Sequence, residues 1–439
     1  MMSRRTGPGM PGQFGPELRE CPGCGLLQAV PALDPGVTAV CPRCHTTLHR
    51  HTGQTLDAAF ALTLAALVLL IVMAASTLMT VATVGIVHHA DLLSGPEELV
   101  RRDMPSLAFV VVFVTLIAPL CKLGGTLYVL GSLRRRDPPH HLRPIFVLVE
   151  RLRPWSMIEV FVFGVFVAYV KLGDLVQINL GVGVFALLAL TSVMVWADGS
   201  LDREAVWARI GRTDQRLFAD GLGTGFGFAG ATGCEVCGLV SLRRAEPADC
   251  PRCDAVLHRR KPDSVARTWA LVIAAAVLYI PANLYPVLTV MQLGSGAPST
   301  ILGGVEELIA SRMYPLAALV FFASIAVPML KLLGLSFMLI TIQTGRSAWL
   351  PDRTRLYHIV RWIGRWSMID IFMESLLGAL VRFGTVVTIQ PGMGAVAFCG
   401  VVILTMFAAE TFDPRLMWDA AAQRAPAAIP FGVPQVGSD

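Results

Sequence analysis

The chain has 439 residues, of which 54% are hydrophobic and 15% are charged, with a net charge of +5. An ordinary soluble domain has about 25% charged residues, so this composition excludes that class and favours a membrane protein. The positive charge lies in short segments between apolar runs, as it does in membrane proteins, and gives no reason to invoke nucleic acid binding.

Eight of the ten cysteines form two sets of paired Cys-x2-Cys motifs. The sets are Cys21, Cys24, Cys41 and Cys44, and then Cys234, Cys237, Cys250 and Cys253. Each pair has the form of a turn that aims two thiolates at one ion, and four thiolates suit a closed, structural zinc site. The sequence therefore predicts two zinc-ribbon (rubredoxin-like) domains, at residues 19–51 and 234–260, with a disordered N-terminus at 1–18.

Other interpretations of the cysteines stay open at this point. Iron is the alternative ion, because a rubredoxin-type centre uses the same four thiolates. Disulfides are disfavoured if these domains face the reducing cytosol. Four thiolates leave no ligand position for the neighbouring His45, His49 and His258. Metal would fold domains too small to hold a core, and the ribbons would then serve partner docking or, with iron, electron transfer.

Eight apolar runs are candidate membrane spans, since a helix needs about 20 residues to cross a bilayer. They are Ala58–Ile86, Leu107–Leu133, Trp155–Val170 and Val176–Trp196, followed by Val265–Val290, Leu316–Ile342, Ser367–Val381 and Val387–Ala409. The third run of each set is short enough to be tilted, partly buried or incompletely spanning. We expect an all-α polytopic protein with two tandem four-helix modules, at 57–197 and 265–410, joined by a linker at 198–233 and ending in a disordered tail at 425–439.

Arginines gather in the segments after the second and the sixth run, for example Arg134 to Arg136 and Arg353 to Arg355. The positive-inside rule places these segments in the cytoplasm. With eight spans, both termini and both ribbons are then cytoplasmic, and the segments near 88–103 and 292–312 face outward.

The chain repeats itself at offsets of 209 residues (Glu97 to Glu306) to 211 residues (Trp155 to Trp366). The segment Arg153–Glu159 returns as Gly364–Asp370. Two copies of one module therefore lie in tandem, and differences between the copies point to function.

Each copy has a lysine near the middle of its second run, Lys122 and Lys331, three residues after a proline, Pro119 and Pro328. A charge at that depth is expensive and needs a partner, and a proline there frees a carbonyl and bends the helix. The acidic candidates lie in the third runs, with hydroxyl groups beside them. They are Glu159 with Ser156 in the first copy, and Asp370 and Glu374 with Ser367 in the second. Either the charges fix helix packing, or they form a polar site for a lipid headgroup or a proton-responsive gate.

Only the second copy carries Pro281-Ala282-Asn283 and Pro286 at the end of its first run. Two prolines around an asparagine are expected to break the helix beside protein or a water-filled cavity. This asymmetry indicates that the second module is the working one and the first is more of a scaffold.

These motifs together resemble the paraquat-inducible protein A family, whose LetA-type members are inner-membrane components of envelope lipid transport. The resemblance covers nearly the whole chain and rests on the ribbons, Ile280–Pro286, Pro328–Lys331, Arg365–Asp370 and Phe412–Arg415. It implies a bacterial inner-membrane protein that passes phospholipid to or from a periplasmic MCE-domain tunnel protein. It also implies that Lys331 and Asp370 belong to one polar network, and it leaves any activity of the first module open.

The leading hypothesis is lipid handling without covalent chemistry, so we expect no enzyme activity. A cleft in the second module would admit phospholipid from the bilayer, with Asn283, Lys331, Asp370 and Glu374 engaging the headgroup, and protonation of an acid would couple movement to the proton gradient. The sequence contains no Gly-x4-Gly-Lys-Ser/Thr pattern, so direct ATP use is not supported. Alternatives are an iron-containing membrane redox protein, a small-molecule or ion transporter, and a membrane anchor for the partner.

Overall fold

The computed structural model describes residues 17–424, apart from 32, 84–85, 136–138, 140, 174–176, 211–230, 243–247, 293–294 and 381–386. The predicted disorder at both termini falls almost wholly outside these residues, as does most of the predicted linker. The first part of that linker is helical, since α8 (Arg203–Ile210) lies within it.

Helices make up most of the described chain. In the first half they are α1 (Leu56–Ala75), α2 (Ser94–Arg101), α3 (Pro105–Val112), η1 (Phe113–Ile117), α4 (Ala118–Ser132), α5 (Leu142–Leu152), η2 (Arg153–Trp155), α6 (Ile158–Gly173), α7 (Val182–Ser200) and α8. In the second half they are α10 (Ser264–Leu284), α11 (Ile301–Ala310), α12 (Tyr314–Phe321), η3 (Phe322–Ala326), α13 (Val327–Thr344), α14 (Leu350–Ile363), η4 (Gly364–Met368), α15 (Ile369–Leu380), α16 (Met393–Thr411) and α17 (Arg415–Arg424).

The strands of the described residues form six small antiparallel sheets, and the all-α prediction did not anticipate those outside the ribbons. The ribbon hairpins are β1 (Glu17–Glu20) with β2 (Leu27–Val30), β3 (Thr38–Val40) with β4 (Thr47–Arg50), β8 (Ala231–Gly233) with β9 (Val240–Leu242), and β10 (Ala248–Asp249) with β11 (Val256–Leu257). Two three-stranded sheets join helix ends. They are β6 (Ile86–Ala90), β5 (Met79–Thr83) and β7 (Gln177–Leu180), and β13 (Ser295–Ser299), β12 (Leu288–Gln292) and β14 (Val387–Pro391), each in that spatial order.

Seven helical segments of the described chain are long and apolar enough to cross a membrane. They are Leu56–Ala75, Pro105–Ser132, Leu142–Val170, Val182–Ser200, Ser264–Leu284, Tyr314–Thr344 and Met393–Thr411. The chain is therefore a multi-pass membrane protein.

The expected eighth span, Ser367–Val381, is not among them. Its described part is the end of η4 and the 12-residue α15. At 1.5 Å per residue α15 is about 18 Å long, too short for a hydrocarbon core of about 30 Å. Nearly every residue of α15 is buried, because the helix packs between α6 and α2 of the first half. The run is apolar because protein surrounds it, not because lipid does.

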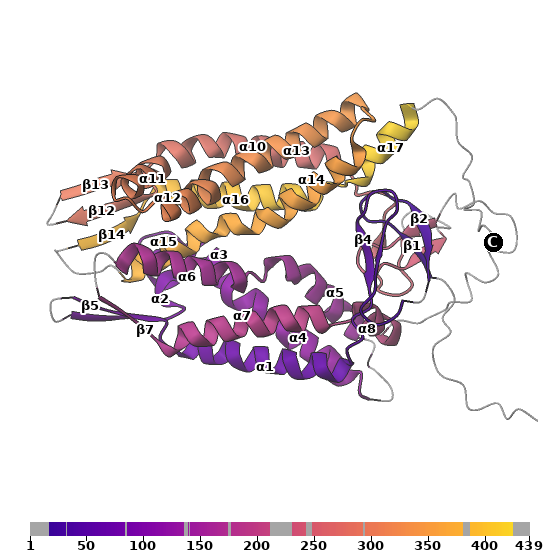
Figure 1. Cartoon of the computed structure of the whole chain (residues 1–439), viewed down its shortest axis with the longest axis horizontal. Coiled ribbons are helices and arrows are strands. Elements are labelled where there is room, and N and C mark those ends of the chain that lie inside the picture. The colour runs from indigo at the N-terminus through magenta and orange to yellow at the C-terminus, as the bar shows by residue number, and fades with distance from the viewer. Residues whose placement is uncertain are drawn as a thin grey trace, which may run out of the picture.

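The long helices lie side by side, with the two three-stranded sheets at one end and the ribbons at the other (Figure 1). Within each half the first and last spans pack along each other, α1 with α7 and α10 with α16. The third helices, α6 and α15, pack together and join the halves, with Phe161 and Phe372 in edge-to-face contact at 5.4 Å.

The ribbons pack on the halves in a crossed manner. The cysteines of the first ribbon share a buried cluster with Tyr357, Phe412 and Trp418 of the second half. Those of the second ribbon share one with Phe146 and Trp207 of the first half. Each ribbon therefore covers the half that it does not directly precede in the sequence.

Candidate functional site

Both cysteine sets assemble as the motifs predict. In the first ribbon Cys21 Sγ lies 3.4 Å from Cys44 Sγ, and Cys24 Sγ lies 3.6 Å from Cys41 Sγ. In the second ribbon the distance is 3.5 Å for both corresponding pairs, which are Cys234 with Cys253 and Cys237 with Cys250. All eight side chains are buried free thiols.

This geometry fits a tetrahedral metal ion. Four sulfur ligands with bonds of about 2.3 Å stand about 3.8 Å apart at the corners of a tetrahedron, close to the spacing in both clusters. The turns leave Gly25 and Gly238 with positive φ angles of 73° and 72°, which glycine adopts without strain. Two four-sulfur sites that fit a metal ion are therefore built into the fold, and four sulfurs accept zinc or iron.

Lys122 is neutralised by a residue that the sequence analysis missed. Its Nζ donates a 2.7 Å hydrogen bond to Oδ2 of Asp198, in the last turns of α7. The acidic candidate Glu159 is exposed on α6, and Lys122 bonds Asp198 instead. The pair lines a small pocket with Glu150 and Arg153.

Lys331 has a different environment. Its side chain is 2% exposed, and its Nζ donates to the carbonyl oxygen of Gly364 at 3.1 Å and to Oγ1 of Thr405 at 3.3 Å. Within the described chain it makes no ion pair, so the expected pairing with Asp370 or Glu374 is not found. At the position of Asp198, 211 residues on, the second copy has Ala409.

A small pocket at the boundary between the halves is lined in part by Lys331. Its lining combines cationic, apolar and acidic side chains: Pro154, Trp155, Lys331, Val360, Arg361, Gly364, Arg365, Thr405, Met406, Ala409 and Glu410. Arg361 pairs with Glu410 at 3.1 Å, whereas half-buried Arg365 makes no ion pair in the described residues. The pocket thus holds more positive than negative charge.

The other predicted polar residues lie elsewhere. Asp370 and Glu374 are both 6% exposed on α15, where it packs against α6 and α2, and neither lines the Lys331 pocket. Ser156 and Ser367 occupy matching buried positions, and the hydroxyl group of each lacks a hydrogen-bond partner in the described residues.

The helix around Pro281 is not broken as expected. Pro281 lies inside α10, which continues to Leu284, and the Nδ2 of Asn283 donates back to the carbonyl of Tyr279 at 2.8 Å. The motif therefore ends a helix. Gly394, at the start of α16, then donates to the carbonyl of Pro286.

The prolines before the lysines act through local helix geometry. Pro119 and Pro328 are each the second residue of an α-helix that directly follows a π-helical turn, η1 and η3. A proline cannot donate to the carbonyl four residues back and would clash with it, and a π turn relieves both effects. Each π turn therefore shifts the phase of the helix that carries the lysine, a little more than one turn before Lys122 and Lys331.

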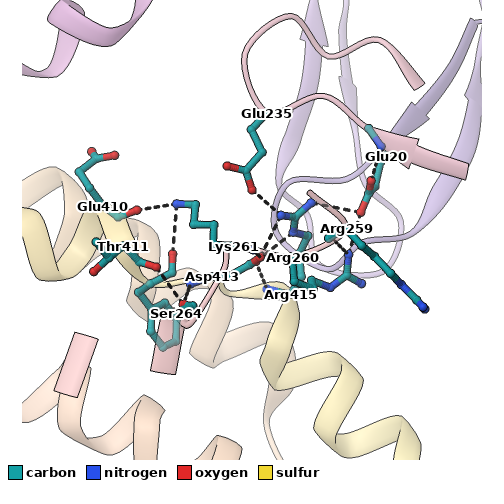
Figure 2. A network of polar contacts seen from close by, with 12 residues as sticks. Glu20, Glu235, Arg259, Arg260, Lys261, Ser264, Glu410, Thr411, Asp413 and Arg415 are labelled. Carbon is teal, nitrogen blue, oxygen red and sulfur yellow. Dashed lines mark hydrogen bonds and ion pairs between the residues drawn. The ribbon is translucent and has the colours of Figure 1, made fainter. Parts of the chain in front are cut away.

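A polar network outside the spans was missed by motif analysis (Figure 2). Arg415 donates to both carboxylate oxygens of Asp413, each at 2.9 Å, and to Glu20 of the first ribbon at 3.2 Å. It also bonds Glu235 of the second ribbon. Burial raises the pKa of Asp413, but the hydrogen bonds and charge of Arg415 outweigh this, so the pKa lies below its ordinary value. The network joins both ribbons to the end of α16.

The family model of paraquat-inducible protein A matches two stretches, residues 56–211 and 265–422. The chain belongs to the paraquat-inducible protein A family. Each matched stretch begins at or beside the first span of a half and ends beyond its last span, and the ribbons lie outside both stretches.

Named relatives cover almost the whole chain. Intermembrane transport protein PqiA of Escherichia coli K12 is 36% identical over 402 residues, which is 91% of this chain and 95% of the relative. Lipophilic envelope-spanning tunnel protein A of the same strain is 30% identical over 410 residues, 92% of each chain. A probable intermembrane transport protein of Haemophilus influenzae is 25% identical over 412 residues, 92% of this chain and 96% of the relative. No solved structure matches the chain significantly.

Proposed function

We propose that this protein is a component of an envelope lipid transport system in a bacterial inner membrane. It would pass phospholipid between the bilayer and a periplasm-spanning MCE-domain tunnel protein, without covalent chemistry. The family membership supports this, as do relatives named for intermembrane transport and for an envelope-spanning tunnel. The multi-pass fold places its polar pockets among membrane-spanning helices.

The pocket around Lys331 is the observation that carries the proposal. A phospholipid has an anionic phosphate beside acyl chains, and this pocket sets Lys331 and Arg365 beside Trp155 and Met406. Charge-assisted hydrogen bonds from lysine and arginine are the usual protein contacts of phosphate oxygens. Bound phosphate would also supply the negative charge that Lys331 lacks among the described residues.

Comparison with Lys122 supports a division of labour between the halves. The first pocket already contains the carboxylate of Asp198 at 2.7 Å from Lys122, so an anionic headgroup would be repelled there. The second pocket has Ala409 at the matching position. In this proposal the chain consists of tandem modules of which the second binds lipid and the first is structural.

We assign supporting roles to the remaining polar residues of the second module. Asp370 and Glu374, buried on the helix that joins the halves, are the candidates for proton uptake coupled to a movement of α15. Ser367, Asn283, Pro281 and Pro328 would shape the helix ends and the π turn around them. The metal centres would hold zinc and fold the ribbons.

The proposed orientation puts the ribbon end of the helices in the cytoplasm. Arg134, Arg143 and Arg353 lie in or beside the segments at that end, and positive charge in short loops marks the cytoplasmic side. The two three-stranded sheets at the opposite end would then face the periplasm and the tunnel partner (Figure 1).

The test is lipid crosslinking in cells from a photoreactive residue at Met406, which lines the pocket. Lys331→Met should lower crosslinked phospholipid about tenfold or more, because hydrogen bonds to charged groups contribute ~1.5–3 kcal/mol. Lys331→Arg should retain most of it. Arg355→Ala, an exposed position on α14, is the matched control and should change nothing. Full crosslinking and an intact envelope with Lys331→Met would refute the lipid site.

A further inference from the structure

A third group of metal-ligating side chains lies outside both cysteine clusters. His49 and His51 of the first ribbon and Asp202 of the first half place one ligand atom each within 4.8 Å of one another. His51 Nδ1 lies 3.2 Å from Oδ2 of Asp202. We propose that these three residues bind a divalent transition-metal ion of the zinc class.

The backbone aims all three side chains at one point. His49 pairs with Ala39 in the β3–β4 hairpin, and His51 extends this pairing beyond Arg50, because its N–H donates to the carbonyl of Val37 at 3.1 Å. Residues two apart on an extended strand point to the same side, so the imidazoles share a face. The ribbon's hairpin thus presents a His-x-His pair to the corner between α7 and α8.

Asp202 is equally fixed. Its Oδ1 accepts hydrogen bonds from the N–H groups of Glu204 at 3.0 Å and Ala205 at 3.2 Å, which cap α8. This leaves Oδ2 directed at the histidine. The side chain is 9% exposed, so the carboxylate is held in place before any ion binds.

The repeat shows that a cation belongs at this corner. Asp413 is the counterpart of Asp202, 211 residues on, and Arg415 neutralises it at 2.9 Å. The position of Arg415 is taken in the first copy by Glu204, which pairs with Arg19 and Arg252 instead. A metal ion held by two imidazoles and one carboxylate would supply the positive charge that no Lys or Arg of the described residues brings to Asp202.

The donor set indicates the kind of ion and its effect. Two imidazoles and one carboxylate suit zinc and its neighbours, and three protein ligands leave a position for water, unlike the closed four-sulfur sites. Because the ligands come from the ribbon and from the α7–α8 corner, the ion would clamp the first ribbon to the first half. The same ribbon already packs its cysteine cluster on the second half.

Metal content of the purified full-length protein, equilibrated with micromolar buffered free Zn²⁺, tests this site. With zinc also in the two cysteine clusters, wild type should hold three zinc ions per chain, and His49→Ala or His51→Ala should hold two. Asp202→Asn should also lose one ion, and since asparagine caps helices as well as aspartate does, α8 should stay folded. His258→Ala alters an exposed histidine at the matching place in the second ribbon and should keep three.

The experiment separates the new site from the cysteine clusters by its second readout. With Co²⁺ in place of zinc, the thiolate charge-transfer bands of the clusters should stay unchanged in His49→Ala and Asp202→Asn, while one equivalent of cobalt is lost. If the cysteine clusters hold iron, the total zinc per chain is lower, but the variants should still hold one zinc ion fewer than wild type. A wild-type protein with no zinc beyond the clusters, or variants that keep it, would overturn the proposal.

Discussion

Two lysines at matching places in the repeat have opposite surroundings. Lys122 is paired with Asp198 at 2.7 Å, whereas Lys331 donates to a carbonyl and a hydroxyl group and has no ion pair among the described residues. The difference arises from one position in the last span of each half, aspartate in the first and Ala409 in the second. In the proposed lipid site, this single side chain would decide whether an intramembrane lysine acts in packing or takes an anionic ligand.

Removal of the Asp198 carboxylate should destabilise the first half. Lys122 is 7% exposed and Asp198 is 31% exposed, so Asp198→Ala should cost about 2 kcal/mol, between the values for surface and buried pairs. Adding Lys122→Met should restore most of the lost stability, since methionine removes the charge that Asp198→Ala leaves unpaired. Melting of the detergent-solubilised protein measures both. Asp57→Ala, which breaks a pair exposed on both sides, is the control, and an equal loss there would contradict the argument.

At the scale of elements, the contact between α6 and α15 holds the halves together. A Cβ atom at Gly164 would lie 2.8 Å from the Cβ of Phe372, and one at Gly95 would lie 2.2 Å from Oγ of Ser375. Small residues allow such close helix approach in membranes, where no hydrophobic effect drives association. The short, buried α15 therefore belongs to the interface between the halves.

Gly164→Ala should push these helices apart and cost about 1–3 kcal/mol, as overpacking does in well-packed cores. The control is Gly124→Ala on α4, where an added Cβ meets nothing within 4 Å. Thermal unfolding compares the two variants. Size-exclusion chromatography of both variants should show no change of oligomeric state, since the contact lies within one chain. Equal stability of the two variants would show that the close approach is not required.

At the scale of the molecule, the ribbons fasten the halves crosswise. Thr46 of the first ribbon lies 3.2 Å from His358 of α14, and Arg43 stacks over Trp418 of α17 at 4.3 Å. The second ribbon places Asp254 3.4 Å from Arg143 of α5. Loss of one metal centre should therefore loosen the half on which its cysteine cluster packs more than the half that follows the ribbon in sequence.

Hydrogen exchange of ribbon variants checks this crossing. Cys21→Ser with Cys24→Ser should unfold the first ribbon, because metal binding folds such domains, and should raise exchange in α14 and α17 several-fold. Cys250→Ser with Cys253→Ser should do the same in α5 and α8. Faster exchange in the half next to the altered ribbon, with the other half unchanged, would contradict the crossed arrangement.

Much of the architecture follows from local patterns. The Cys-x2-Cys spacing alone was enough to predict both clusters, because a turn of that length aims two sulfurs at one point. The length of the apolar runs was enough to predict seven spans, because the hydrocarbon core has a fixed thickness that a helix must match. The same reasoning failed for α15, since apolar composition does not distinguish lipid from protein neighbours.

The sequence by itself determined the metal-binding turns, the membrane-crossing helices, the duplication and the family, all of which depend on local spacing or on similarity along the chain. Only the tertiary structure decided which carboxylate meets Lys122, what lines the pocket of Lys331, and which half each ribbon covers. Those contacts join residues far apart in sequence, such as Lys122 with Asp198 and Glu20 with Arg415. The physical reason is that partner choice for a charge depends on how helices and domains pack together, and no residue spacing along the chain encodes that.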